Sequence, residues 1–229
     1  MVCLAVREYD VSLCVCGDLK GEEYLVLLVL PSGADLTHCG EVAALGVSET
    51  LVGVGLECYL AVIYANTERT DTVYGFSAIV DDESKTKEKI QKIKGRGDEK
   101  PFIQLISSPE DIKKYTDDEI PSNLLNYWPG PLTIIVNDKR INSTTAFRCP
   151  ADEWLRKIIK ECNAPIYSTS VNRSGNPILE TENEILAEFN DEVDLFVLDG
   201  DKINALPSTI VSVCDGNFKI IRQGCLKIN

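Results

Sequence analysis

The sequence predicts an α/β protein in which helices cover a mixed β-sheet, and three observations support this fold class. From about residue 70 onward, short apolar runs rich in β-branched residues alternate with amphipathic segments of helical period. Two further apolar runs lie close together near the end of the chain, which favours paired strands beside the alternating units. A chain of 229 residues that is 44% hydrophobic is long and apolar enough to bury the core of such a sheet.

The first sixty residues differ in composition from the rest of the chain. Only Arg7 and Lys20 of the 23 basic residues precede residue 64, whereas five of the nine cysteines do. Strand-like runs occur at 11–16, 24–30 and 59–65. They form either an additional sheet-forming extension or an unusual version of the first elements of the main domain. We therefore divide the chain into an atypical N-terminal segment, 1–60, of unknown role, and a main domain, 61–229.

The first elements of the main domain are a strand and a helix. The run TVYGFSAIV at 72–80 has the composition of a strand. The segment 81–95 begins with acidic residues and ends with basic ones, which suits the macrodipole of a helix, and Gly95 and Gly97 are its stop signals. A strand at 101–107 follows, and Ser108 with Pro109 then supplies a cap and a first turn for a helix over 108–116.

The later elements continue the alternation. A helix is expected at 151–162, where Trp154, Leu155, Ile158 and Ile159 fall on one face, and another at 181–189. The remaining expected strands are 131–136, 144–150, 165–170, 194–200, 208–213 and 219–224.

Composition excludes several classes of protein. The longest apolar run, 24–30, is far shorter than the roughly 20 residues needed to cross a bilayer, and the start of the chain lacks the basic region of a signal peptide. We expect a soluble, cytoplasmic protein with no membrane association. The nine cysteines are odd in number and irregularly spaced, so reduced thiols are expected and no metal site is predicted. A net charge of −13 argues against binding nucleic acid by phosphate neutralisation alone.

Against this acidic background, the stretch KIKGRGDEKP at 92–101 concentrates positive charge. Lys94, Arg96 and Lys100 stand around two glycines at the end of the expected helix. A glycine-rich loop lets the backbone approach a ligand closely, and these side chains can donate to several phosphate oxygens. A solvated basic helix end is the alternative, because the macrodipole alone favours it.

A second polar stretch, PIYSTSVNRSGNPI at 165–178, places hydroxyls and an amide at the end of an expected strand. Ser168, Ser170 and Asn172 precede a turn that contains Gly175. The carboxyl ends of strands in open sheets are common ligand sites. An ordinary polar turn is the alternative.

Taken together and in order, these and further stretches resemble the signatures of the YrdC-like threonylcarbamoyl-adenylate synthase family. The matching stretches are TDTVYG (70–75), KGRGDEKP (94–101), WPGPLT (128–133), TTAFRCP (144–150), STSVNRSG (168–175), PSTIV (207–211) and IIRQG (220–224). The resemblance covers about 70–224. It implies a three-layer fold with a twisted, mixed sheet, and the short form of the family without an additional C-terminal domain.

The resemblance also implies roles for individual residues. The residues implied at the threonine end are Thr70, Tyr74, Arg148, Ser168 and Ser208. The residues implied in ATP binding are Lys94, Arg96, Lys100, Thr144, Ser170, Asn172 and Arg222, of which Lys94 and Arg96 are the candidate catalytic pair.

The implied reaction joins L-threonine, bicarbonate and ATP into threonylcarbamoyl-adenylate and pyrophosphate, with Mg²⁺ accompanying ATP. Downstream tRNA threonylcarbamoyl transferase proteins would receive the product, with possible weak contact to tRNA. Positioning and charge neutralisation suit this chemistry, which needs no covalent nucleophile from the protein. Two alternatives stay open: a non-catalytic nucleotide- or RNA-binding module, and carbamoyl-adenylate chemistry that uses carbamoyl phosphate, as in hydrogenase-maturation proteins.

Overall fold

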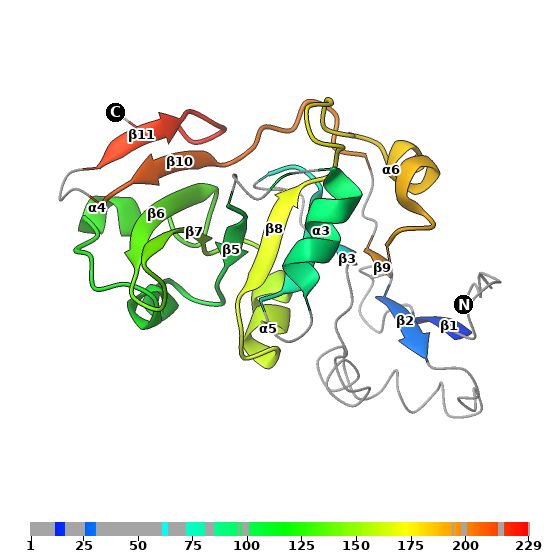
Figure 1. The fold of residues 1–229 in the computed structure, drawn as a ribbon, viewed down its shortest axis with the longest axis horizontal. Helices are drawn as coiled ribbons and strands as arrows, with labels where there is room; N and C mark the ends of the chain where they lie inside the picture. Colours follow the sequence, from blue (N-terminus) through cyan, green and yellow to red (C-terminus); the bar gives the residue numbers. More distant parts are fainter. Residues whose placement is uncertain are drawn as a thin grey trace.

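The structure, a computed structural model, describes residues 12–16, 26–30, 61–63, 72–80, 85–95, 97, 101–193, 195–197, 201–214 and 218–228. Within these residues the chain forms a nine-stranded mixed sheet with helices on both faces, and a separate two-stranded sheet (Figure 1). The predicted fold class is therefore confirmed. None of the helices in the described part of the chain has the length and apolarity to cross a membrane.

The large sheet is built from strands that follow the expected apolar runs. Its members are β3 (Ala61–Ile63), β4 (Gly75–Ile79), β5 (Ile103–Leu105), β6 (Leu132–Asp138), β7 (Ser143–Arg148), β8 (Ile166–Ser170), β9 (Leu195–Val197), β10 (Thr209–Ser212) and β11 (Lys219–Arg222). Their spatial order is β11-β10-β6-β7-β5-β8-β4-β3-β9. The pairs β10–β6, β5–β7 and β3–β9 are parallel, and the remaining pairs are antiparallel.

The three strand-like runs near the N-terminus have two different fates. The strands β1 (Ser12–Cys16) and β2 (Val26–Leu30) pair with each other in the small antiparallel sheet. The strand β3 instead joins the large sheet between β4 and β9. The third run thus belongs to the main domain, while most of 1–60 lies outside the described residues.

Helices form at the expected places, with two differences. The helices are α3 (Thr86–Lys94), η2 (Pro109–Lys114), α4 (Ser122–Leu125), α5 (Glu153–Glu161) and α6 (Glu182–Phe189). The segment expected as a helix over 108–116 is a 3₁₀ helix, held at its start by a capping box of Ser108 and Asp111. The short helix α4 was not predicted. The helix α3 ends as expected at Gly95, whose φ of 59° is the left-handed conformation that glycine adopts readily.

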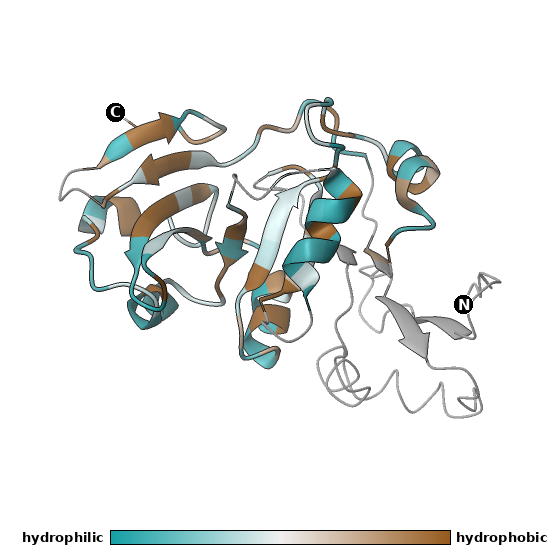
Figure 2. Cartoon of the chain, viewed as in Figure 1, coloured by the Kyte–Doolittle hydropathy of each residue, from teal (hydrophilic) through white to brown (hydrophobic). Residues whose placement is uncertain are grey.

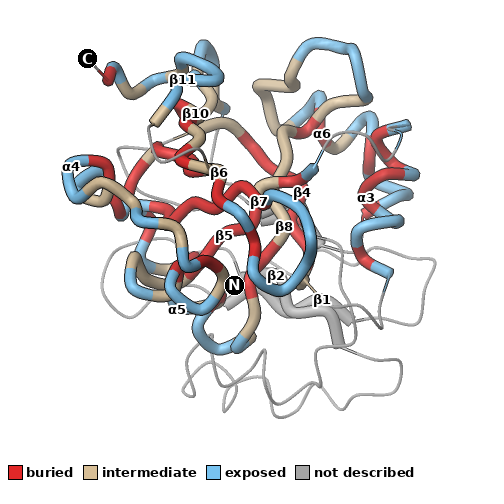
Figure 3. The backbone as a smooth tube through the Cα atoms, turned by 60° about the vertical axis from the view of Figure 1, so that its left-hand side comes forward, coloured by how far each residue is buried: buried red, intermediate tan, exposed pale blue. Residues whose placement is uncertain are grey.

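Three groups of buried apolar side chains hold the layers together. Tyr74 and Phe76 of the β4 segment pack against α3 and α6, and Phe147 of β7 packs in a second group with η2, α4 and β6. The third group lies under α5, where Leu155 and Ile159 contact Leu105 of β5, as the predicted apolar face of this helix requires. Figure 3 shows the central strands β5, β6 and β7 buried, while α3 alternates between buried and exposed residues.

These groups assign the two faces of the sheet, because side chains alternate along a strand. The α3–α6 and η2–α4 groups share one face, to which Phe76 and Phe147 point. The helix α5 covers part of the opposite face, to which Leu105 and Ile166 point. Figure 2 shows β8 passing from an apolar start to near-neutral hydropathy toward its end, where its hydroxyl residues lie.

Candidate functional site

The predicted site residues of β7 and β8 point to the same face of the sheet as α5. In β7, Thr144 and Arg148 alternate with Phe147, which points to the other face. In β8, Ser168 and Ser170 share the face of Ile166, which packs under α5. Residues of the TTAFRCP and STSVNRSG motifs thus share one surface of the sheet.

Small side chains make up this face where β8 meets β4. Gly75 pairs with Ser170, and Ser77 pairs with Ser168. A Cβ atom at Gly75 would come within 3.3 Å of the Ser168 hydroxyl oxygen, so this strand pair tolerates little additional bulk. With only short hydroxyl side chains and a glycine, no large side chain projects from the sheet here. A ligand can therefore approach the backbone at the strand ends closely.

The Lys94 side chain is buried and faces oxygen atoms of the loop after β8. Its ammonium nitrogen lies 2.6 Å from the Ser170 carbonyl oxygen, 2.9 Å from the Asn172 carbonyl oxygen and 2.9 Å from the Asn172 side-chain oxygen. The Ser170 hydroxyl donates to the same Asn172 side-chain oxygen at 2.8 Å. The Asn172 amide donates in turn to the carbonyl oxygens of Arg173 and Asn176. Three predicted ATP residues therefore form one network that shapes this loop.

Arg148 is only 7% exposed, and it joins β7 to the segment before β4. Its Nη1 atom donates a hydrogen bond to Thr72 Oγ1 at 3.0 Å. The TDTVYG and TTAFRCP motifs thus meet through these two side chains, although 76 residues separate them. Thr72 lies within a quoted motif, but it was not selected as a site residue.

Two hydroxyl groups lie close together at the start of β10. The hydroxyl oxygens of Ser208 and Thr133 are 2.8 Å apart, and both side chains are buried. Arg222 of β11 donates through Nε and Nη2 to the Ser208 carbonyl oxygen, at 3.2 and 2.8 Å. In the antiparallel pair of β6 and β7, Ile134 lies opposite Phe147. The preceding residue of β6, Thr133, therefore lies beside Arg148, the residue after Phe147. The sequence analysis did not select Thr133 as a site residue, although it closes the WPGPLT motif.

Gly224 explains why the IIRQG motif ends in glycine. A Cβ atom at this position would lie 2.2 Å from the Pro207 carbonyl oxygen and 2.5 Å from the Ser208 carbonyl oxygen. Any side chain here would push the backbone of Ser208 out of place. The Gly224 N–H also donates to the Thr209 hydroxyl at 2.9 Å. The close approach of the two backbones therefore fixes where Ser208 lies.

The structure does not bring every predicted residue to this surface. Tyr74 is fully buried among the apolar side chains of the α3–α6 face, and its hydroxyl donates to Glu182 at 3.4 Å. Thr144, in contrast, does lie on the site face, where its side chain is exposed. Thr70, Arg96 and Lys100 lie outside the described residues.

The neighbouring Cys149 is a buried thiol of the apolar core. Burial raises the pKa of its thiol to about 12, so the side chain is a neutral thiol at physiological pH. Its side chain points to the opposite face from Arg148 and packs with the Phe147 group. In the part of the chain that the structure describes, no three carboxylate, thiol or imidazole side chains gather into a metal site.

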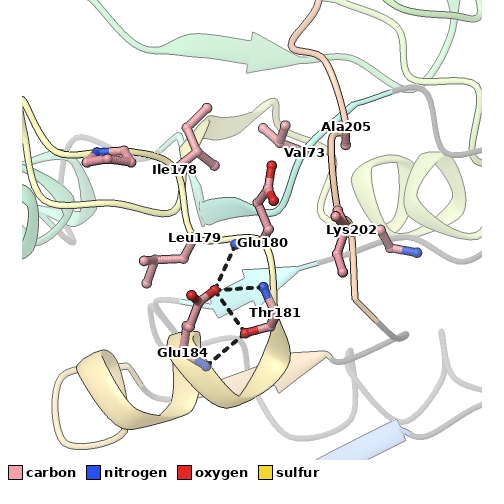
Figure 4. A pocket seen from close by; sticks show the side chains of 10 residues that line it. Val73, Ile178, Leu179, Glu180, Thr181, Glu184, Lys202 and Ala205 are labelled. Carbon is pink, nitrogen blue, oxygen red and sulfur yellow. Dashed lines mark hydrogen bonds between the residues drawn. The ribbon is translucent and has the colours of Figure 1, made fainter.

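A pocket of about 440 Å³ adjoins the site at Val73. Figure 4 shows its lining on one side from Ile178, Leu179, Glu180, Thr181 and Glu184, and on the other from Lys202 and Ala205. The Glu184 carboxylate is already engaged in the cap of α6, where it accepts from the N–H and the hydroxyl of Thr181. The wall of the pocket is therefore fixed by hydrogen bonds within the protein.

Comparison with known proteins identifies the class to which this fold and site belong. The Sua5/YciO/YrdC family model, described as telomere recombination, matches residues 67–224. This match spans most of the chain and all seven quoted motifs. The chain belongs to this family.

Two curated relatives carry names that describe an activity. A threonylcarbamoyl-AMP synthase from Pyrococcus abyssi is 28% identical over 170 residues, which cover 69% of this chain and 50% of the relative. A Methanocaldococcus jannaschii protein, provisionally named a threonylcarbamoyl-AMP synthase, is 31% identical over 167 residues, covering 69% of this chain and 79% of the relative. The chain thus matches about half the length of the Pyrococcus relative. Both names describe enzymes that form threonylcarbamoyl-AMP.

A solved structure agrees with the same assignment. The crystal structure of P. abyssi Sua5 complexed with L-threonine has a TM-score of 0.63 and 27% sequence identity, and it covers 73% of this chain and 51% of that chain. The large sheet of the present protein is therefore the sheet of this family.

Proposed function

We propose that this protein is an L-threonylcarbamoyladenylate synthase. It would combine L-threonine, bicarbonate and ATP into threonylcarbamoyl-adenylate, pyrophosphate and water. The observation that carries the proposal is that Arg148 of β7, Ser168 and Ser170 of β8, and Ser208 just before β10 share one face of the sheet. The names of the relatives support the same activity.

The threonine end of the site would lie around Arg148. A guanidinium can hold a carboxylate through two parallel hydrogen bonds, and Thr72 holds Arg148 at 3.0 Å in a fixed position. The buried hydroxyl pair of Thr133 and Ser208 lies beside it and can exchange hydrogen bonds with the hydroxyl or amine of threonine. Tyr74 would support the preceding segment from the core, and Thr70 would complete this end.

The nucleotide would bind where α3 meets the loop after β8. Ser170 and Asn172 shape the loop, and Lys94 holds it from below. Arg96 and Lys100, which follow Lys94 in the sequence, would carry the phosphates, with Arg222 and Thr144 on the flanks. Mg²⁺ bound to ATP would neutralise part of the phosphate charge.

The chemistry needs orientation and charge neutralisation. The threonine amine takes up bicarbonate as a carbamate with loss of water, and a carbamate oxygen then attacks the α-phosphorus. The new P–O bond forms as the bond to pyrophosphate breaks. Three anionic groups must come together, so fixed guanidinium and ammonium groups would lower the barrier by offsetting their repulsion.

Pyrophosphate release from ATP and bicarbonate, with and without L-threonine, tests this proposal. We expect release to require threonine and to fall at least about tenfold in Arg148→Gln and Arg96→Ala, because charge-assisted contacts to substrate are lost. Arg140→Gln is the matched control, since Arg140 lies over Tyr115 on the opposite face of β7. Threonine-independent release, or none, would contradict the proposal.

A non-catalytic nucleotide-binding module is the second candidate. It would share the loop of Ser170 and Asn172 and would bind ATP in an equilibrium titration. It would show no turnover when threonine and bicarbonate are added. The same assay, run beside a measurement of ATP binding, therefore separates the two functions.

A further inference from the structure

Arg173 lies in the loop that follows β8 and contacts α3, α6 and the segment just after α6. Its Nη1 atom donates to the carbonyl oxygen of Ile93 in the last turn of α3. Its Nε atom donates to Glu188 Oε1 at 3.0 Å, and Nη1 donates to Glu192 Oε2 at 3.1 Å. Nη2 contacts the other Glu192 oxygen. The guanidinium also lies over the ring of Phe189, 4.5 Å from its centroid.

The contacts of Arg173 are adjacent to the hydrogen bonds of Lys94, because both involve the loop after β8. Arg173 follows Asn172 directly, and the Asn172 amide donates to the Arg173 carbonyl oxygen at 3.0 Å. The next residue, Ser174, donates its N–H to the Lys94 carbonyl oxygen at 2.7 Å. The loop is therefore held to α3 through Lys94 and Ser174, and to α6 through Arg173.

Only an arginine side chain can make this set of contacts. The planar guanidinium uses three nitrogen atoms in a fixed fork, whereas a lysine ammonium is a single centre. Stacking on Phe189 further favours the flat cation. Hydrogen bonding from Arg173 lowers the pKa of Glu192 below its ordinary value, so its carboxylate stays ionised near neutral pH.

We propose that Arg173, together with Glu188 and Glu192, is a positioning residue that fixes the Ser170–Asn172 loop for ATP. The inference rests on the proposed function, because it concerns the nucleotide end of the same site. Arg173 itself would not touch the nucleotide. The side chains of Arg173 and Glu192 are 32% and 39% exposed, so solvent weakens the ion pair. The main effect of Arg173 would therefore be on the geometry of the loop after β8.

The test measures the KM values for ATP and for threonine separately, together with kcat and the thermal midpoint. We expect Arg173→Gln to raise the KM for ATP on the order of tenfold, since a displaced loop misplaces its ligand. The KM for threonine should change less than about twofold, because the Arg148 end is untouched. Arg173→Lys should recover part of the loss, and Glu192→Gln should reproduce part of it.

Arg140→Gln provides the matched control. Arg140 is also ion-paired, to Asp138 at 2.6 Å, and its guanidinium lies 4.3 Å from the Tyr115 centroid. Its loss should lower the thermal midpoint without changing the KM for ATP. If Arg173→Gln behaves as Arg140→Gln does, or raises both KM values equally, the positioning role is wrong.

Two further measurements keep the inference testable. If Arg173→Gln does not fold, Glu188→Gln and Glu192→Gln are combined, and an unchanged KM for ATP in that double variant overturns the proposal. If the wild type shows no threonine-dependent turnover, the proposed function fails while the inference can still be judged. Equilibrium titration with ATP then tests the positioning role of Arg173. A dissociation constant about tenfold larger in Arg173→Gln than in the wild type supports this role, and equal constants overturn it.

Discussion

Arg148 donates a hydrogen bond to the Thr72 hydroxyl at 3.0 Å and thereby connects two motifs that lie on different strands. Its side chain is almost entirely buried, so the orientation of the guanidinium depends on the acceptors around it. Thr72 is one such acceptor, and the threonine carboxylate would be another. The hydrogen bond therefore links the position of the TDTVYG segment to substrate binding.

Thr72→Val should weaken threonine binding while leaving ATP binding intact. Valine keeps the shape of threonine but removes the hydroxyl that accepts from Arg148. Hydrogen bonds to charged groups contribute about 1.5–3 kcal/mol, so we expect the KM for threonine to rise about tenfold. Thr116→Val is the control, because the Thr116 hydroxyl accepts from the Asp118 N–H at 3.0 Å on the far side of β7. Equal KM values for threonine in both variants would contradict this expectation.

Lys94→Met should destabilise the protein. The ammonium lies among three partly buried oxygen atoms of Ser170 and Asn172, and methionine would remove the donor that these three acceptors share. We expect a loss of about 2–4 kcal/mol in the free energy of unfolding, measured by urea denaturation. Lys92→Met is the matched control on the exposed face of the same helix and should change it by less than about 0.5 kcal/mol. A loss of the same size at both positions would show that the loop contacts are unimportant.

The sequence predicts the order of the elements well, because their signals are local. The cap at Ser108, the apolar face of α5 and the left-handed Gly95 each depend on a few neighbouring residues. The 3₁₀ form of η2 is different, because the cap at Ser108 and the proline after it suit the start of an α-helix equally well.

The arrangement of the candidate site residues could be predicted less completely, because side-chain direction depends on strand register and on packing. Tyr74 stands next to Gly75 in a recognised motif, yet alternation along the strand turns it into the core. Thr133 and Ser208 are brought together by the parallel pairing of β6 with β10, which no local pattern reveals. The acceptors of Lys94 likewise come from a loop 76 to 78 positions away.

The ion pair of Asp138 and Arg140 should make stability depend on pH in the acidic range. Burial alone would raise the pKa of Asp138, but hydrogen bonds from Arg140 and Thr145 outweigh it and lower the pKa below 3.8. The stabilisation is therefore present above the ordinary pKa and is lost as the pH falls through the folded value. Asp138→Asn should be less stable than the wild type near pH 7, and urea denaturation should show this gap closing toward pH 3. A gap that stays constant would contradict the assigned cause.

Alkylation of the native protein should not modify Cys149. Its buried thiol has a pKa of about 12, and the thiolate is the form that reacts. Cys225 is exposed and should react. Peptide mass spectrometry after brief iodoacetamide treatment measures both sites, and pyrophosphate release from the alkylated protein should persist. Rapid modification of Cys149, or loss of activity that ATP and threonine prevent, would show that a thiol takes part in the site.

Gly224→Ala should disturb the threonine end through the backbone. The added methyl group would meet the Pro207 carbonyl oxygen at 2.2 Å and Ser208 atoms at 2.5 Å, and these are backbone atoms that cannot rotate away. Relieving this clash requires movement of Ser208, which would break its 2.8 Å contact with Thr133. We expect a loss of about 1–3 kcal/mol in stability and a KM for threonine that rises more than the KM for ATP. Gly97→Ala is the control, since a Cβ atom there meets nothing within 4 Å, so this variant should retain the stability of the wild type. A variant at Gly224 with unchanged stability and kinetics would mean that the two backbones have more freedom than their close approach implies.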